Sequence, residues 1–230
     1  MLFVEDVATP VEVSSEEFSN SEEFSTSTHI QTARRAVDSL VNLVERGEWR
    51  VTSSSRDVEL SSSKCGAFQG KCILPPYISL RDLKTFLSDY RTRHLVDDHL
   101  EEVQLVDVYK SSESEIINLQ YLSYKRTLMV SGREFVITTC VQDIDENSFV
   151  IASTSVEDPR YAEPRNSRVR ASLVLGGYIA RQLSTGIELI MTSNTHLGGK
   201  LPEMLTTPIQ RQKPAEFLQK IKVQLSRLKL

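Results

Sequence analysis

The sequence lacks the long apolar runs and the short signature motifs that assign proteins to several common classes. No apolar run approaches the roughly 18 residues that a membrane-spanning helix needs. The N-terminus has no basic stretch followed by an apolar one, so we expect no secretory signal peptide. The chain also has no P-loop, no Gly-x-Gly-x-x-Gly and no Gly-x-Ser-x-Gly, the motifs of phosphate-binding loops, dinucleotide folds and serine hydrolases. We therefore expect a cytoplasmic protein that meets membranes only at their surface.

Cysteine and histidine are scarce, and their spacing suits neither disulfides nor metal. Cys65, Cys72 and Cys140 are an odd number with no framework spacing, which favours reduced thiols. His94 and His99 are five residues apart, off the i,i+4 spacing of two metal ligands on one helix face. We predict no metal site and no cofactor.

Charge is divided unevenly along the chain. Residues 1–28 contain seven acids and no Lys or Arg, whereas the remainder contains 24 acids and 27 Lys or Arg. An acidic segment of low hydrophobicity predicts a disordered, Ser-rich tail over residues 1–28, followed by one folded domain over residues 29–230. No dense basic patch with interleaved aromatics occurs, so nucleic-acid binding is disfavoured.

Hydrophobic periodicity predicts an α+β domain. Thr28 and Gln31 form a capping-box pattern at the start of a helix that ends before Gly47. Three strands, two helices, about six strands and a long amphipathic helix follow. The predicted strands cover residues 49–54, 57–63, 68–74 and most of 103–197, and the predicted helices begin at Ser79, near Leu95 and at Pro214. Consecutive antiparallel strands favour a curved meander whose concave face the last helix covers.

Four short motifs occur in order across the second half of the chain. They are Arg133-Glu134-Phe135, Ser155-Val156-Glu157-Asp158-Pro159, Arg168-Val169-Arg170-Ala171 and Gly199-Lys200-Leu201-Pro202. This ordered set resembles the START family, the steroidogenic acute regulatory protein-related lipid-transfer domains. The resemblance implies a helix-grip (START/Bet v 1-like) fold, in which about nine antiparallel strands curve around a long C-terminal helix. It also implies an internal tunnel that holds one lipid without converting it, so we expect no enzyme and no catalytic residue.

The resemblance assigns structural roles to the motif residues Arg133, Glu134, Arg170 and Pro202. An arginine at a strand start is suited to bridging carboxylates or carbonyls. The sequence departs from the family pattern at three positions. Val96 and Lys200 stand where tryptophans are usual, and His196 stands where an aspartate is common.

The resemblance also bears on the ligand. Sterol-type members pair a basic residue, six positions after the motif arginine, with an acid on an earlier strand; here these positions hold Thr139 and Gln120. Ser153 lies where ceramide-type members have a polar cavity residue. A hydroxyl and an amide can hydrogen-bond an uncharged headgroup without the cost of burying charge. We expect a neutral or zwitterionic lipid, namely ceramide, sterol, diacylglycerol or phosphatidylcholine. The predicted lipid-binding residues are Asn118, Gln120, Thr139, Ser153, Asn194, His196, Phe217 and Ile221.

Lipid exchange requires a gate and a transient membrane contact. The last helix, hinged near residues 206–208, and the loop of residues 157–167 are the expected gate, with basic residues on the outer side of the helix meeting lipid headgroups. Phe18 and Phe24 each follow a Glu-Glu pair. This pattern resembles the acidic motifs that recruit some lipid-transfer proteins to a membrane receptor, but such motifs are degenerate and a plain solvated tail is the simpler interpretation.

Two other classes of function stay open. A helix-grip enzyme, a hydrolase or cyclase acting on an apolar substrate, would need an ionisable group facing the cavity, and His196 is the candidate. Asp97 and Asp98 have no partner base, and Cys140 fits buried packing. A lipid-regulated interaction module would instead use bound lipid to change the exposure of the acidic tail.

Overall fold

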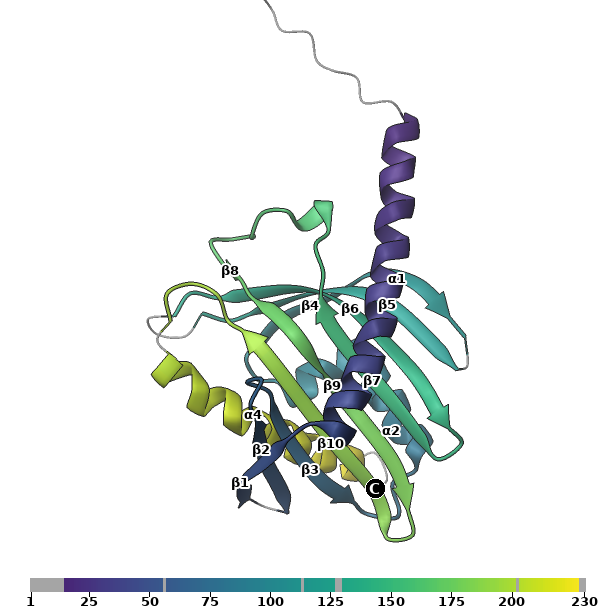
Figure 1. Cartoon of the computed structure of the whole chain (residues 1–230), viewed down its shortest axis with the longest axis vertical. Coiled ribbons are helices and arrows are strands. Elements are labelled where there is room, and N and C mark those ends of the chain that lie inside the picture. The colour runs from purple at the N-terminus through teal and green to yellow at the C-terminus, as the bar shows by residue number, and fades with distance from the viewer. Residues whose placement is uncertain (1–14, 56, 113, 127–129, 202, 228–230) are drawn as a thin grey trace, which may run out of the picture.

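One large β-sheet organises the chain, and helices cover both of its faces (Figure 1). The computed structural model describes residues 15–55, 57–112, 114–126, 130–201 and 203–227, with the backbone alone for residues 15–24, 55 and 203–205. The helices are α1 (Ser15–Arg46), α2 (Leu80–Ser88), α3 (Arg93–Val96) and α4 (Glu203–Arg227), with 3-10 turns η1 (Tyr90–Thr92) and η2 (Pro159–Tyr161). The strands are β1 (Trp49–Ser55), β2 (Val58–Ser63), β3 (Phe68–Leu74), β4 (Leu100–Ser111), β5 (Glu115–Tyr124), β6 (Arg133–Asp145), β7 (Ser148–Ser155), β8 (Val169–Arg170), β9 (Ser172–Leu183) and β10 (Gly186–His196).

The sheet is antiparallel except at β8, which pairs in parallel with β6. Its strand order is β1-β2-β3-β10-β9-β7-β6-β5-β4. The predicted helix-grip class is confirmed, with ten strands in place of about nine. The predicted cap of α2 is also present, because the Asp82 amide donates to Ser79 Oγ at 3.1 Å. The short helix expected near Leu95 ends at Val96, and β4 begins at Leu100.

Helix α1 begins at Ser15, so the predicted start at Thr28 was wrong and residues 15–28 are helical. Glutamate is a good helix former, and negative charge near a helix N-terminus interacts favourably with the helix dipole. The helix runs across the predicted domain boundary, and its first half extends beyond the sheet (Figure 1). Residues 1–14 of the predicted tail lie outside the described residues.

Helix α4 begins at Glu203, eleven residues before the predicted start, and contains Pro208 and Pro214. Each proline lacks the amide that would bond to the carbonyl four residues earlier. None of the described side chains of residues 206–213 is buried, whereas Ala215, Leu218, Ile221 and Leu225 are. At Gly70 of β3, an added Cβ would lie only 2.9 Å from both Pro214 and Leu218. Helix α4 is therefore anchored in the core from Pro214 onward, whereas its described side chains before Pro214 stay outside the core.

The two faces of the sheet carry separate cores, because side chains of a strand alternate between faces. The outer core packs under α1 and includes Ala33, Leu40, Cys140 and Val150. The inner core packs under α2 and α4 and includes Leu60, Leu83, Leu189 and Leu218. In Figure 1, α1 crosses the front of the sheet and α4 lies behind it.

Glu134 is the first residue of β6 whose side chain points to the outer face of the sheet, and it has no exposed surface. Its carboxylate accepts hydrogen bonds from Arg170 Nη2 at 2.6 Å, from Tyr121 Oη at 2.8 Å and from the Arg165 amide at 3.0 Å. Burial alone would raise the pKa of Glu134, yet these donors together hold it below its ordinary value. Glu134 therefore stays ionised in the interior and joins β5, β6, β8 and the chain before β8.

Replacing this carboxylate is expected to destabilise the fold. Glu134→Gln leaves the Arg170 guanidinium half-buried without its counter-ion, and we expect the free energy of unfolding to fall by about 3 kcal/mol. Glu101→Gln is the matched control, because Glu101 pairs with Arg168 as an exposed carboxylate, and should cost no more than about 1 kcal/mol. Urea unfolding measures both, and equal losses would contradict the role assigned to Glu134.

The stability lost in Glu134→Gln is expected to depend on pH. The pKa of Glu134 is lower in the folded chain than in the unfolded one, so its stabilisation is complete above about pH 4.3, the ordinary pKa of a glutamate. That stabilisation is lost as the pH falls through the lower, folded value. The stability difference between the wild type and Glu134→Gln should therefore shrink below about pH 4.3.

Candidate functional site

A cavity of about 760 Å³ lies between the inner face of the sheet and the helices α2, α3 and α4. This volume falls within the roughly 300–1,000 Å³ of small-molecule sites. Most of its wall is apolar, because the inner-facing positions of β6 and β7 carry aliphatic and aromatic side chains. The apolar wall includes Phe86, Val96, Leu122, Phe135, Ile137, Val141, Ile151, Met191 and Phe217.

Three polar side chains, Gln120, Thr139 and Ser153, interrupt the apolar wall on the neighbouring strands β5, β6 and β7. We call them the polar cluster. Thr139 Oγ1 and Ser153 Oγ are 2.8 Å apart, so one hydroxyl donates a hydrogen bond to the other. The O–H of the accepting hydroxyl is then left free to donate to a ligand. Gln120 Nε2 donates to Asn118 Oδ1 at 2.8 Å. Gln120 Oε1 is buried and has no hydrogen-bond partner among the described residues.

The polar cluster therefore offers a ligand one free acceptor and one donor, and carries no formal charge. Two further hydroxyls of the wall, those of Ser88 and Thr192, are also buried without a partner in the described part of the chain. Buried polar groups are normally hydrogen-bonded. Unmet hydrogen-bonding capacity on a cavity wall is what a site for a polar part of a ligand requires.

Tyrosines and an ion pair complete the wall on the side of α3 and α4. Lys213 Nζ of α4 lies 3.3 Å from Asp97 Oδ1, which is buried just after α3. Burial raises the pKa of Tyr178 to about 12 and also raises that of Tyr124, so both hydroxyls are protonated hydrogen-bond donors at neutral pH. Tyr178 Oη makes no hydrogen bond to any residue that the structure describes.

The cavity opens to solvent where its wall residues are exposed, and we call this region the mouth. The exposed wall residues are His99, Lys125, Ser131, Pro208, Ile209, Gln212 and Glu216. Ile209 is 60% exposed although it belongs to the wall. Beside the mouth, Arg133 donates to the carbonyls of Ser131 at 2.5 Å and Leu197 at 3.1 Å. Arg133 thus joins the chain before β6 to the chain after β10.

Four of the predicted lipid-binding residues line the cavity, namely Gln120, Thr139, Ser153 and Phe217. Asn118 accepts the hydrogen bond from Gln120 but does not line the cavity, and Ile221 is packed in the inner core. The prediction that Asn194 and His196 line the cavity was wrong. Asn194 Nδ2 donates to the Cys65 carbonyl at 3.2 Å, and His196 is exposed. The residue on which the enzyme alternative rested therefore does not face the cavity.

The residues of β10 that line the cavity are mainly odd-numbered, namely Met191, Ser193 and Thr195, with Thr192 the exception. The sequence could not indicate this phase, because Leu189, Ile190 and Met191 are all buried and both faces of β10 are covered. Arg133 was assigned only a structural role, although it also lines the cavity. Counting back from Thr139 in steps of two along β6 would have placed it on the inner face. Pro202 lies outside the described residues.

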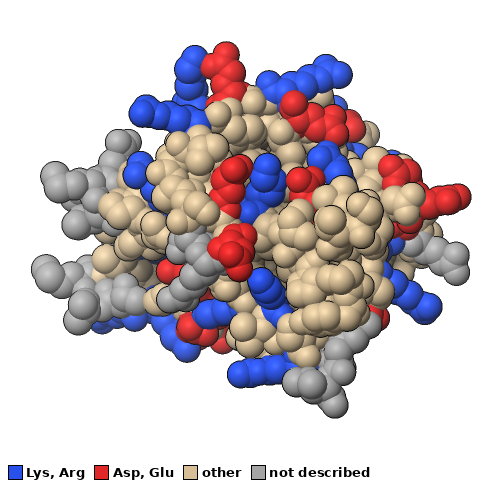
Figure 2. Space-filling model, turned by 90° about the horizontal axis from the view of Figure 1, so that it is seen from below, with Lys and Arg blue, Asp and Glu red and all other residues tan. Residues whose placement is uncertain are grey.

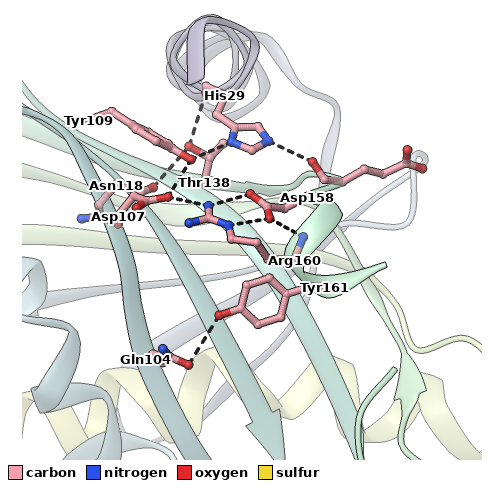
Figure 3. Close-up of polar contacts among 10 residues, drawn as sticks. His29, Gln104, Asp107, Tyr109, Asn118, Thr138, Asp158, Arg160 and Tyr161 are labelled. Atoms are coloured by element: carbon pink, nitrogen blue, oxygen red, sulfur yellow. Dashed lines mark hydrogen bonds and ion pairs between the residues drawn. The ribbon is translucent and has the colours of Figure 1, made fainter. Parts of the chain in front are cut away.

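The loop of residues 157–167, expected in the gate, lies on the outer face and contributes nothing to the cavity wall. Figure 3 shows how it is attached to α1 and β4. His29 Nε2 donates to the Glu157 carbonyl at 2.9 Å, and Arg160 bridges Asp158 and Asp107 at 2.8 and 2.5 Å.

Aromatic contacts hold the rest of this loop. The rings of Tyr161 and Tyr121 stack with centroids 5.1 Å apart, and the Arg165 guanidinium lies 4.4 Å from the centre of the Tyr161 ring. These contacts, together with the Arg165 amide bond to Glu134, fasten the loop at both ends. The loop is thus held on the outer face of the sheet, away from the cavity wall.

Most of the remaining reactive groups are buried in packing or form ion pairs, and Cys65 is an exposed thiol outside the cavity wall. All three cysteines are free, and burial raises the pKa of the Cys140 thiol to about 12. Asp98 pairs with Lys220 at 2.5 Å, so neither aspartate of the Asp97-Asp98 pair is left over. Within the described ranges, no group of three or more His, Cys, Asp or Glu could hold a metal ion. None of the described helices is long and apolar enough to cross a membrane.

The fold is shared with proteins of known structure. The structure is similar to that of human StAR-related lipid transfer protein 5, with a TM-score of 0.78 and 16% identity over 89% of this chain and 100% of that one. Human STARD10 gives a TM-score of 0.69 and 16% identity over 83% of this chain and 78% of that one. A STAR-related lipid transfer protein fragment from Xanthomonas axonopodis gives 0.63 and 17% identity over 77% and 98%. At these identities the likeness establishes the fold.

The sequence itself decides the family. No curated protein sequence matches the chain significantly. The family model described as the START domain, however, matches residues 76–229, more than half of the chain. The matched segment contains α2, α3, the strands β4 to β10 and all of α4, and thus the described cavity wall. The chain therefore belongs to the START domain family.

Proposed function

We propose that this START-domain protein is a lipid carrier that holds one lipid in its cavity and exchanges it with membranes. The observation that carries the proposal is the buried, unpartnered Gln120 Oε1 in an otherwise largely apolar cavity. Leaving a buried acceptor unsatisfied costs about 1–3 kcal/mol, and a ligand hydroxyl or amide N–H would remove that cost. Acyl or ring carbons against the apolar wall would add about 0.8 kcal/mol per buried methylene. The wall supplies affinity, and the polar cluster selects the ligand.

An uncharged cluster favours a neutral or zwitterionic lipid among ceramide, sterol, diacylglycerol and phosphatidylcholine. Gln120 Oε1 can accept a hydrogen bond from a donor on the ligand, and the remaining O–H of the Thr139–Ser153 pair can donate one to an acceptor on the ligand. Ceramide, sterol and diacylglycerol each carry a hydroxyl. Ceramide adds an amide with both a donor and an acceptor, so it matches the cluster most completely.

The gate in this proposal is the first part of α4, up to Pro214. Its polar attachments to the rest of the wall include Gln210 Nε2 to the Thr195 carbonyl at 3.1 Å and Lys213 to Asp97 at 3.3 Å. Pro214 marks the change from this segment to the buried one, so it replaces residues 206–208 as the hinge. Lys125, Val130, Ser131, Leu197 and Leu201, which belong to the cavity wall, replace the loop of residues 157–167 in this gate.

Membrane contact would be transient, with the protein cytoplasmic between encounters. Ile209, at the mouth and largely exposed, is suited to enter the interfacial layer of a bilayer. Recruitment to a membrane receptor through the acidic residues around Phe18 and Phe24 remains a separate proposal, and those two side chains lie outside the described ones.

The decisive experiment identifies the bound molecule. The purified protein is incubated with a total lipid extract, and native mass spectrometry then measures the mass of the complex and of what is released on denaturation. We expect one lipid per chain, drawn from one of the four classes above. A protein that is reproducibly empty would overturn the carrier proposal.

The role of the polar cluster is tested by Gln120→Leu, which keeps the volume of the side chain but removes the free acceptor. In the wild type, a hydroxyl-bearing lipid should bind about tenfold more tightly than its O-methylated analogue, the value of one buried hydrogen bond. In Gln120→Leu this ratio should fall to about one, as measured by displacement of a fluorescent lipid. Gln142→Leu, on the same sheet but outside the cavity wall, is the control. A similar fall of the ratio in that variant would contradict the role proposed for Gln120.

The gate is tested by loosening α4 on either side of Pro214. Gln210→Ala removes the bond to the Thr195 carbonyl and should accelerate lipid transfer between vesicles about fivefold, the value of a hydrogen bond near 1 kcal/mol. Gln224→Ala removes an equivalent amide that donates to the Leu95 carbonyl from the anchored part of α4. That variant should leave the transfer rate unchanged. Equal acceleration by both would mean that α4 moves as one body.

A further inference from the structure

Arg133 is a buried cation whose charge no described carboxylate neutralises. Its side chain is 8% exposed and lies on the cavity wall. Its partners in the described part of the chain are three carbonyl oxygens, those of Ser131, Leu197 and Gly198. Carbonyls accept hydrogen bonds but bring no formal negative charge. The adjacent residue Glu134, by contrast, has Arg170 as its counter-ion.

The other charges of the cavity wall do not supply the missing anion. Among the described wall residues, Asp89 and Asp97 are already paired with Arg91 and Lys213, which leaves Glu216 as an acid without a described partner. On the cationic side, Arg93 and Lys125 line the wall and make no ion pair with any described residue. The unpaired wall charges are therefore mostly positive.

This excess is local and does not extend over the whole molecule. Figure 2 shows that basic and acidic side chains are interspersed over the face it presents, with no broad area of one sign. The chain as a whole carries a formal net charge of −4. A preference for anions at the mouth must therefore arise from the wall residues themselves.

The guanidinium of Arg133 also retains donors. An arginine side chain has five N–H groups in a planar fork, and the three carbonyls use one on each nitrogen. One N–H remains on each terminal nitrogen, an arrangement suited to the two oxygens of a carboxylate or phosphate. Burial lowers the pKa of Arg133, but a guanidinium stays protonated in proteins.

We propose that Arg133 is an oxyanion-binding residue at the mouth of the cavity, where it takes a carboxylate or phosphate borne by a lipid. The inference rests on the proposed carrier function. Arg133, Phe135, Ile137 and Thr139 follow one another on the inner face of β6. Six residues of strand place Arg133 about 20 Å from Thr139, and four place it about 13 Å from the level of Gln120, which pairs with Ile137. The oxyanion is thus distinct from the group that the polar cluster binds.

Two sources could supply the oxyanion. It could be the far end of the cargo itself, bound while its other polar group occupies the polar cluster. It could also be a headgroup of the bilayer, bound when the mouth meets the membrane. The chemistry at Arg133 is the same in both cases, and the two arms of the experiment separate them.

The first arm uses no membrane. Binding of a fluorescent long-chain fatty acid is compared with binding of its methyl ester. In the wild type the acid should bind at least about tenfold more tightly, the value of a charge-assisted hydrogen bond. The ratio should fall to about one in Arg133→Gln, and it should fall in Arg93→Gln and rise in Glu216→Gln. Arg126→Gln is the matched control, because Arg126 is exposed and outside the wall, and should leave the ratio unchanged.

The second arm uses phosphatidylcholine vesicles with or without phosphatidylserine and a neutral fluorescent diacylglycerol as cargo. If the bilayer supplies the oxyanion, phosphatidylserine accelerates transfer by the wild type, and the acceleration is lost in Arg133→Gln but kept in Arg126→Gln. An effect in the first arm assigns the oxyanion to the cargo. The absence of an effect in both arms overturns the proposal.

Two controls separate a loss of the oxyanion site from a loss of the fold or of lipid binding. Unchanged affinity of Arg133→Gln for the methyl ester shows that its cavity is intact, and if this variant does not fold, Arg93→Gln and Glu216→Gln carry the test with opposite expected signs. A wild type that binds neither the acid nor the ester contradicts the carrier function itself. A wild type that binds both equally, with no effect of phosphatidylserine, contradicts only the oxyanion site.

Discussion

The ion pair between Glu134 and Arg170 is the interaction on which the arrangement around the cavity depends. A carboxylate without exposed surface is tolerated only when donors surround it, and here those donors come from β5, from β8 and from the chain that leads to β8. Compensating the charge therefore fixes that chain on the outer face of the sheet. It also fixes the phase of β6, because Glu134 facing outward turns Arg133, Phe135, Ile137 and Thr139 inward. The composition of the cavity wall follows from a pair that never touches the cavity.

The sequence predicted those parts of the fold that local patterns encode. The strands β1 to β3 and the Ser79 cap were expected where they occur, because each is bounded by turn residues or by a side-chain cap. The limits of α1 and α4 were wrong for a common reason. Capping boxes and prolines suggest helix ends, but glutamates continue α1 before Thr28, and α4 contains Pro208 and Pro214 within one helix.

Prediction of the candidate site was limited by information that is not local. Gln120, Thr139 and Ser153 lie on the cavity wall as the sequence predicts, since one correctly placed residue fixes the parity of its whole strand. Their role in lipid binding stays a prediction. Asn194 and His196 were misplaced because β10 carries apolar side chains on both faces. Its pattern of hydrophobic residues therefore does not show which side chains face the cavity. The outer-face position of residues 157–167 depends on His29, Asp107 and Tyr121, which come from three distant segments. No spacing in the sequence shows that these segments meet.

The position of the cavity ties the persistence of the protein to what fills it. The space is enclosed by the same side chains that form the inner core, so an occupant would become part of the packing of the folded state. A ligand bound only by the folded form adds about 2.7 kcal/mol of stability at a concentration one hundred times its dissociation constant. For a chain of ordinary marginal stability, that gain decides how often it opens to proteases. The abundance of such a carrier would then follow the supply of its cargo, without any change in its synthesis.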